Sequence, residues 1–327
     1  MLGNLRARGC NLAGVDACTS LETQVSRFLD CGWHGARAWD MVQVYQSLPN
    51  GERQRIERLE MLDEGELLVQ LFQHYAITIA WVAKLDELAT FPGNSQRRGS
   101  AMCSHPCDEA VIATNDDASE CKRSAVRLGY WQDDYLGYFV KSPAERKAPE
   151  INRGYFARVR GVEICIEKFL HRTAGNPCQI INLGCGFDTL YWRLREAGHA
   201  IANFIELDFP TVTARKCYAI KRNKRLLDKI HVAEDGEVRL SPTDLHASNY
   251  HIMGVDLRNI DELHNKLNQA EIDYTIPTIF LAECVLVYIE TQNCHNLLKW
   301  LAGHFPTSVF VNYEQVNMND REEICRH

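Results

Sequence analysis

The chain has 327 residues, a hydrophobic content of 46% and a formal net charge of −7. This length is enough for one large α/β domain, or for two small domains, with an ordinary hydrophobic core. A nucleic-acid surface would need a basic patch that this acidic balance does not supply, so we expect no nucleic-acid partner.

The number of cysteines and the length of the apolar runs indicate the cellular compartment of the protein. Thirteen cysteines, an odd number, are scattered from Cys10 to Cys325. This favours free thiols in a reducing compartment over a disulfide framework. The longest apolar-rich run, residues 76–83, is far too short to span a membrane, and no secretion signal is visible at the N-terminus. We therefore expect a cytoplasmic protein without membrane contact.

The N-terminal part of the chain contains both helical and extended patterns. Residues 36–48 have a helical pattern, residues 58–62 are predicted to be extended, and a helix is expected to begin at Asp63. Residues 76–82 form a β-branched run that is apolar on both faces. Such a run would be an aggregation hazard at an open edge, so we expect it to lie between two other strands.

Residues 90–117 have the composition of a linker. Gly, Pro, Ser, Asn and charged residues gather there with little periodicity, so we expect a flexible surface loop or disorder. Cys103, His105 and Cys107 have a metal-like spacing. A closed tetrahedral site usually needs a second group of ligands elsewhere in the chain, and none accompanies these three neighbouring residues. We therefore predict no metal.

Apolar strand candidates alternate with helical patterns from Pro177 onwards. This alternation predicts an α/β fold with a doubly wound parallel sheet. The candidate strands are residues 178–183, 202–207, 250–256, 277–283 and 308–314.

The segment 178–189 (CQIINLGCGFDT) is the most informative stretch. An apolar run ends at Gly-Cys-Gly, residues 184–186, and Asp188 follows at once. A strand that stops on a tight glycine turn lets a ligand approach the backbone. Glu206 and Asp208, at the end of the next strand, could bind ribose hydroxyls. The third glycine of a dinucleotide fingerprint is missing, which favours adenosylmethionine; a simple strand-to-helix turn is the alternative.

Several longer strings strongly resemble the leucine carboxyl methyltransferase family. They are residues 121–135, 146–159, 181–194, 204–210, 254–258, 281–288 and 312–321. The resemblance implies a seven-stranded class I methyltransferase sheet of the Rossmann-like type. It also implies that S-adenosyl-L-methionine donates a methyl group to the C-terminal leucine carboxylate of the protein phosphatase 2A catalytic subunit, without a metal.

The N-terminal part resembles the C-terminal region of that family, so the order is circularly permuted. We therefore predict one domain, in which residues 1–89 are the family's C-terminal part, 90–117 the linker and 118–327 the family's N-terminal part. The N-terminal block then supplies strands six and seven, with residues 58–62 and 75–83 beside the strand at 308–314. A true rearrangement, a gene prediction that joins two tandem copies, and an engineered rearrangement all fit this order.

The resemblance assigns four residues to the adenosine part and the glycine loop. Gly184 approaches the amino-acid part of adenosylmethionine, and Asp208 binds the ribose, for which Glu206 is the less favoured acceptor. Asp256 accepts from the adenine amine and Leu257 packs on the ring. Capping of the following helix is an alternative role for Asp256.

Four more residues are assigned to the methionine part and the acceptor. Arg158 and Lys122 match two basic contacts to the methionine carboxylate, a role that suits a guanidinium and an ammonium group. Glu283 ends the fourth strand and is expected to hold the cofactor's ammonium group. Tyr288 borders the acceptor or packs in the core. Arg158 and Tyr288 are candidates for positioning, and no side chain is assigned to chemistry itself.

The expected chemistry needs no general base, because a peptide carboxylate with a pKa of about 3.5 is already ionised at neutral pH. Three alternatives stay open. The chain could be the inactive product of a misjoined tandem gene, a relative of the enzymes that modify a tRNA guanosine, or a small-molecule O-methyltransferase.

Overall fold

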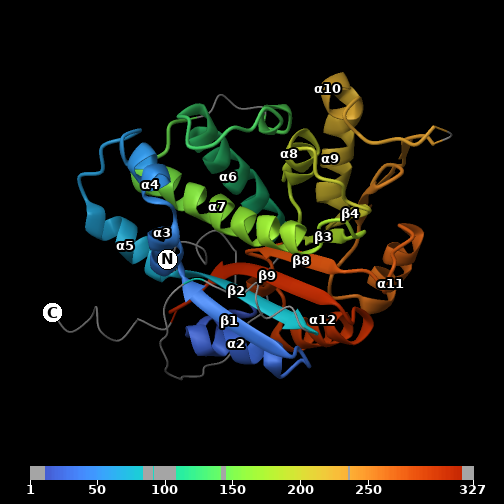
Figure 1. Cartoon of the computed structure of the whole chain (residues 1–327), viewed down its shortest axis with the longest axis horizontal. Coiled ribbons are helices and arrows are strands. Elements are labelled where there is room, and N and C mark those ends of the chain that lie inside the picture. The colour runs from blue at the N-terminus through green and yellow to red at the C-terminus, as the bar shows by residue number, and fades with distance from the viewer. Residues whose placement is uncertain (1–11, 84–90, 92–107, 141–144, 235, 319–327) are drawn as a thin grey trace.

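The computed structural model describes residues 12–83, 91, 108–140, 145–234 and 236–318. At its centre is one nine-stranded sheet in the order β1-β2-β9-β8-β3-β4-β7-β6-β5 (Figure 1). The strands are β1 (Gly35–Asp40), β2 (Tyr75–Val82), β3 (Gln179–Leu183), β4 (Asn203–Asp208), β5 (Arg239–Leu240), β6 (Leu245–His246), β7 (Tyr250–Gly254), β8 (Thr278–Glu283) and β9 (Ser308–Gln315).

The central part of the sheet is parallel. β9, β8, β3, β4 and β7 pair in that order and all run in the same direction. They coincide, to within a few residues, with the strands predicted from the apolar runs. Each of them is buried along nearly its whole length, as strands covered by helices on both faces must be. The predicted α/β class is confirmed.

β1 and β2, from the N-terminal part of the chain, extend the sheet beyond β9. β2 runs antiparallel to both of its neighbours, with Tyr75 opposite Gln315 and Ile77 opposite Tyr313. In Figure 1, β2 lies between the blue strand β1 and the red strand β9. The apolar run over residues 76–82 is therefore hydrogen-bonded along both edges, so neither edge of this run is open to another chain.

Two predictions for the N-terminal part are wrong. Residues 58–62 are not a strand; they form turns after a helix, and Met61 is 84% exposed. Residues 36–48 are not one helix, because β1 ends at Asp40 and a helix begins there. The Asp40 carboxylate accepts the Gln43 backbone N–H at 2.8 Å and so caps that helix. Pairing with β2 overrides the weak strand propensity of the sequence GARAWD.

Helices cover both faces of the sheet. Those on one face are α2 (Leu21–Leu29), α11 (Ile260–Gln269) and α12 (Thr291–His304). Those on the other side are α3 (Met41–Ser47), α4 (Asn50–Glu57), α5 (Gly65–Gln73), α6 (Asp108–Arg127), α7 (Pro149–Arg172), α8 (Leu190–Glu196), α9 (Pro210–Arg222) and α10 (Lys224–Leu227). In Figure 1, α6, α7 and α8 lie above the sheet, and α2 and α12 lie below it.

Alternation along the strands divides the hydrophobic core into two layers. Ile180 of β3 belongs to the layer under α7 and α8, whereas its neighbour Ile181 faces α12 on the other side. Phe28 of α2 and Phe310 of β9 join the second layer, with ring centroids 5.1 Å apart. Each fully buried side chain of this kind contributes about 1.5–3 kcal/mol, so the N-terminal helix α2 is held to the sheet by core packing.

The prediction of a loop over residues 90–117 is wrong for its last part. Residues 108–117 form the first half of α6, which packs along α7. Asp108 and Glu109 lie in its first turn, where acidic side chains favour a helix. A circular permutation also predicts that Met1 and His327 lie close together. Both residues lie outside the described part of the chain, as do the cysteines and histidine at positions 103, 105 and 107.

Candidate functional site

A cavity of about 550 Å³ lies at the edge of the sheet where the parallel strands end, between that edge and the helices α6 and α7. All eight residues predicted for the site line this cavity. They are Lys122, Arg158, Gly184, Asp208, Asp256, Leu257, Glu283 and Tyr288. Two ends of the cavity are built differently. We call them the glycine-loop end (Gly184, Gly186, Asp208 and Asp256) and the ion-pair end (Lys122, Arg158 and Glu283).

The glycine-loop end depends on backbone conformations that only glycine adopts readily. Gly184 has φ +64° and Gly186 has φ +49°, both in the left-handed region. A Cβ atom at Gly184 would collide with the side chain of Val285, and one at Gly186 would collide with Asn115 of α6. The loop therefore presents bare backbone to the cavity, which allows a ligand to approach closely.

Asp208 fixes this loop from the end of the next strand. Its Oδ2 atom accepts the Gly186 backbone N–H at 2.7 Å, and its Oδ1 atom accepts the Phe209 backbone N–H at 2.7 Å. Burial raises the pKa of Asp208, and these two hydrogen bonds oppose that shift. Since each carboxylate oxygen has two acceptor positions, Asp208 keeps acceptor capacity for a hydroxyl in the cavity.

Glu206 does not reach the cavity, which excludes the ribose role considered for it. Its side chain is fully buried and its Oε2 atom lies 2.5 Å from Nζ of Lys216. The Tyr250 hydroxyl donates to the same oxygen at 2.9 Å. Burial raises the pKa of Glu206 to about 7, against the opposing effect of Lys216. Lys216 also donates to the Asp188 carbonyl at 2.7 Å, so this buried pair supports the glycine loop from below.

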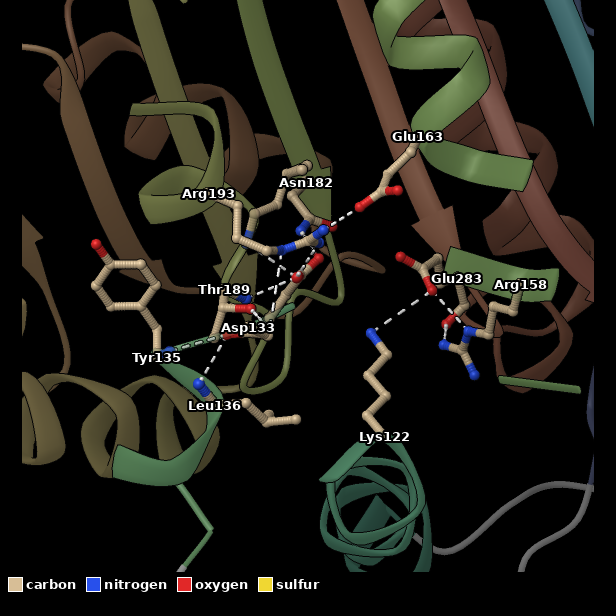
Figure 2. A network of polar contacts seen from close by, with 12 residues as sticks. Lys122, Asp133, Tyr135, Leu136, Arg158, Glu163, Asn182, Thr189, Arg193 and Glu283 are labelled. Atoms are coloured by element: carbon tan, nitrogen blue, oxygen red, sulfur yellow. Dashed lines mark hydrogen bonds and ion pairs between the residues drawn. The ribbon is translucent and has the colours of Figure 1, made fainter. Parts of the chain in front are cut away.

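The ion-pair end brings together residues that are far apart in the sequence. Arg158 of α7 donates from Nε to Oε2 of Glu283 at 2.6 Å, and Nζ of Lys122 lies 3.8 Å from the same oxygen. Figure 2 shows Lys122, from α6, and Arg158 converging on Glu283. Two cations face one carboxylate, so this end has a net positive charge. It can accept the carboxylate of an amino acid while Glu283 accepts its ammonium group.

Aromatic rings hold the Arg158 guanidinium in place. Its central carbon lies 5.0 Å from the centre of the Tyr313 ring and 5.6 Å from that of Tyr155. Burial opposes the charge of Arg158, but the neighbouring Cys284 and Glu283 raise its pKa above the usual value. Arg158 is therefore a fixed cation at any pH at which the protein is folded.

Asp256 is engaged by a residue that the sequence did not single out. Arg258 donates to the Asp256 carboxylate from its guanidinium at 2.7 Å and from its backbone N–H at 2.9 Å, and it also donates to Asp108 of α6 at 2.8 Å. The alternative of helix capping by Asp256 is wrong, because Asn259 caps α11 by accepting the Glu262 backbone N–H. Arg258 belongs to residues 254–258, which resemble the family, but the resemblance assigned roles only to Asp256 and Leu257.

The first half of α6 was also missed as part of the site. Asn115 accepts the Phe187 backbone N–H at 3.0 Å, so α6 holds the glycine loop from above. Asp188 lines the cavity, and its carboxylate accepts a hydrogen bond from the side-chain amide of Asn182 at 3.1 Å. Burial alone would raise the pKa of Asp188, but the positive charges of Lys122, Arg193 and Lys216 lower it to about 2. Asp188 is therefore ionised. Its position directly after the glycines is evident from the sequence, but no role in the site was predicted for it.

A second polar network braces the outer side of the loop. Arg193 pairs with Glu163 of α7, and its Nε atom lies 3.8 Å from Asp133 (Figure 2). Asp133 also accepts the Thr189 hydroxyl and the Leu136 backbone N–H, the latter at 2.9 Å. These contacts tie the segment after α6 to the start of α8, so the loop is fixed on both sides.

The cavity fits S-adenosyl-L-methionine in its chemistry. The bare glycine backbone, the acceptor capacity of Asp208 and the charge pattern at Glu283 complement a nucleoside joined to an amino acid. Within the described ranges, no group of three or more His, Cys, Asp or Glu side chains is placed to hold a metal ion. Among the described helices, none is long and apolar enough to cross a membrane.

Known proteins match most of this chain. The family model of leucine carboxyl methyltransferase matches residues 110–302, which include all eight predicted site residues. "Leucine carboxyl methyltransferase 1" of Bos taurus is 46% identical over 233 residues, covering 69% of this chain and 70% of that protein. The protein of the same name from Rattus norvegicus is 44% identical over 232 residues, covering 69% of each. "tRNA wybutosine-synthesizing protein 4" of Homo sapiens is 39% identical over 216 residues, or 64% of this chain and 31% of that protein.

Proposed function

This chain belongs to the leucine carboxyl methyltransferase family, and we propose that it transfers a methyl group from S-adenosyl-L-methionine to a C-terminal leucine carboxylate. The proposed acceptor is the catalytic subunit of protein phosphatase 2A. One observation carries the proposal: a single cavity joins the glycine-loop end to the ion-pair end. The first suits a nucleoside and the second suits an amino acid, and the cofactor contains both.

We propose the following contacts at the glycine-loop end. The ribose hydroxyls bind Asp208, which lines the cavity and has acceptor capacity left. Asp256 accepts the adenine amine, and Leu257 packs on the ring. Arg258 holds Asp256 in place by three donors, so the carboxylate is oriented before the ligand arrives. The backbone of Gly184 faces the amino-acid part.

At the ion-pair end, Lys122 and Arg158 bind the methionine carboxylate and Glu283 binds the ammonium group. Adenosylmethionine supplies an electrophilic methyl group on a positively charged sulfur. The acceptor carboxylate is ionised at neutral pH, so the protein needs no general base. Its own residues orient both partners and exclude water, and positioning of this kind can supply several kcal/mol. Tyr288, at the rim of the cavity, is the proposed border of the acceptor site.

The experiment is a radiolabel assay with labelled adenosylmethionine. The acceptors are the phosphatase catalytic subunit, the same subunit without its last residue, tRNA and a panel of small carboxylic acids. The proposal predicts base-labile label on the full-length subunit alone. Label on tRNA or on a small acid would move the protein to one of those substrate classes. Cofactor binding without label on any acceptor would support an inactive product of a misjoined gene.

We also propose that the chain is a circularly permuted, seven-stranded class I methyltransferase domain. The support is the sheet order, in which β2 lies antiparallel between β9 and β1. β5 and β6, of two residues each, are additions to the seven. On this proposal the linker, now 90–107, joins the family's original termini. A protease site inserted after Arg98 tests it: after cleavage, the two fragments should stay together and keep their activity, whereas separation in native buffer would contradict it.

A further inference from the structure

The cavity extends past Glu283 to a pair of residues that sequence analysis did not assign. Tyr75 is the first residue of β2 and lies directly opposite Gln315, the last residue of β9. Both line the cavity. In the strand order, β2 and β9 follow β8 on the side away from β3, β4 and β7. The pair is therefore farther from the glycine-loop end than Glu283 is, where a second substrate has room.

The Tyr75 ring is held rigidly. It stacks on Tyr313 with centroids 5.3 Å apart and an interplanar angle of 9°, and Tyr313 in turn carries the Arg158 guanidinium. This stacking fixes the direction in which the hydroxyl points. A phenol on such a support is a donor of defined position beside the ion pair.

The Tyr75 hydroxyl keeps its proton at neutral pH. Burial raises the pKa of the Tyr75 hydroxyl above its usual value, and the hydrogen bond with the Gln315 side chain opposes that shift. The phenol therefore stays protonated at neutral pH, and its O–H can donate to a group in the cavity.

Gln315 also has an unused acceptor. Its side chain is 3% exposed, and its Oε1 atom has no hydrogen-bond partner in the described part of the chain. Buried polar atoms are nearly always paired, and leaving one unpaired costs about 1–3 kcal/mol. Because Gln315 lines the cavity, a ligand there that donates a hydrogen bond can satisfy this acceptor.

We propose that Tyr75 and Gln315 together recognise the last residue of the acceptor chain. The Tyr75 hydroxyl donates to one oxygen of the terminal carboxylate, and Oε1 of Gln315 accepts the backbone N–H of the same residue. This inference rests on the proposed function. A neutral phenol suits the role, because one uncharged hydrogen bond orients a carboxylate and leaves its second oxygen with full nucleophilicity. A guanidinium bound to both oxygens would withdraw that charge.

The test is calorimetric binding of short peptides in the presence of S-adenosyl-L-homocysteine, which allows no turnover. Three peptides end in leucine: one with a free carboxylate, one with a carboxamide, and one with a free carboxylate and an N-methylated last peptide bond. Tyr75→Phe should weaken binding of the free-carboxylate peptide about five- to tenfold, the usual effect of one hydrogen bond. It should not change binding of the carboxamide. Gln315→Leu should abolish the preference for the N–H peptide over the N-methylated peptide.

Tyr45→Phe is the matched control. It removes another hydroxyl from the N-terminal part of the chain, one that is buried without a described partner and lies outside the cavity. It should leave all peptide affinities unchanged, and all three variants should keep the wild-type affinity for S-adenosyl-L-homocysteine. The inference is overturned if Tyr75→Phe keeps the preference for the free carboxylate, or if the wild type has none. A wild type that shows the preference but transfers no label would overturn the proposed function while supporting the assignment of Tyr75.

Discussion

The two ends of the cavity are built on different physical principles. The glycine-loop end comes from residues 182–258 and is fixed by backbone conformation, with φ +64° at Gly184 and backbone hydrogen bonds to Asp208. The ion-pair end is fixed by charges on α6, α7 and β8 that meet only in the folded chain. The first can be damaged by a single methyl group and the second by removal of a charge. Mutations at the two ends should therefore impair the site for different physical reasons, backbone strain at one end and a lost charge at the other.

The largest effect is expected at the ion-pair end. Arg158→Ala removes the cation closest to Glu283, whose side chain is only 14% exposed, and leaves that carboxylate poorly compensated. Loss of a buried, charge-assisted pair is worth roughly 2–4 kcal/mol, so we expect the rate of methyl transfer to fall about a hundredfold or more. A radiolabel assay at saturating acceptor measures it.

Arg160→Ala is the control for this prediction. Arg160 lies on the same helix and pairs with Glu52 and Glu167, away from the cavity. Its loss should change the rate by less than about threefold, as expected for a partly exposed ion pair. Equal effects of the two variants would show that Arg158 acts through the stability of α7 and not through the site.

The second effect should appear in binding at the glycine-loop end. Gly184→Ala forces a side chain into the left-handed region and against Val285. Strain of this kind costs about 1–3 kcal/mol, so the affinity for adenosylmethionine should fall roughly tenfold to a hundredfold in calorimetry. Gly198→Ala separates strain from position: Gly198 has φ +78°, but a Cβ atom there would meet no neighbour within 4 Å, and the residue lies outside the cavity. That variant should lower the melting temperature and leave cofactor affinity unchanged.

A smaller effect is expected where α6 is tied to the glycine-loop end. Arg258→Gln removes the guanidinium donors to Asp256 and the bridge to Asp108, and it leaves the backbone N–H of residue 258 as a donor to Asp256. We expect the cofactor affinity to fall about three- to tenfold, because Asp256 loses its orientation but stays in place. Asp108→Asn breaks only the outer, half-exposed pair, which is worth about 0–1 kcal/mol, and should change the affinity less than the loss of Arg258 does. An equal loss in both variants would mean that the bridge to α6 matters and the orientation of Asp256 does not.

The difference between the two ends of the cavity also explains which site residues could be predicted from the sequence. The glycine loop and Asp208 were visible because a turn and the strand after it lie close together in the chain. Lys122, Arg158 and Glu283 were assigned only through resemblance, since nothing local links positions so far apart. The pairing of β2 with β9 was predicted through the resemblance. Tyr75 escaped notice because its place in the site depends on the register of that pairing, which sets it opposite Gln315.

The errors in the N-terminal part have a related cause. β1 has the sequence GARAWD, which is poor in β-branched residues, and it is a strand because β2 offers it a partner along its whole length. Residues 58–62 alternate, and this local pattern wrongly predicts the strand there. The composition of residues 108–117 predicts a loop, although Val111 and Ile112 line the cavity from a helix. In each case, contacts with distant parts of the chain selected one secondary structure where the local sequence permits more than one.

The smallest effect on methyl transfer is expected from replacing two buried carboxylates, Glu206 and Glu314. Their replacement should change mainly the stability of the protein. Glu206 pairs with Lys216, which also donates to the carbonyl of Asp188 beside the glycine loop. Glu314 of β9 is buried close enough to Arg158 of the ion-pair end for that charge to affect its pKa. Glu314 accepts the Val287 backbone N–H at 2.8 Å, and its nearest cation, Arg27, is 3.8 Å away. Burial raises the pKa of both carboxyl groups to about 7, against the opposing effects of Lys216 and Arg27 respectively.

A folded-state pKa above the unfolded value means that the native protein binds more protons between about pH 4.5 and pH 7. The contribution of Glu314 to the free energy of unfolding is therefore present below about pH 4.5 and is lost as the pH rises through about 7. Glu314→Gln should remove this contribution, up to about 1.4 kcal/mol per pH unit, and so reduce the pH dependence of the denaturation midpoint between about pH 5 and pH 7. Glu206→Gln should instead lower stability mainly above about pH 7, where Glu206 is ionised and its loss leaves Lys216 buried without its anion. If Glu314→Gln keeps the wild-type slope, the carboxylate is ionised in the folded protein and Arg27 compensates it as fully as Lys216 compensates Glu206.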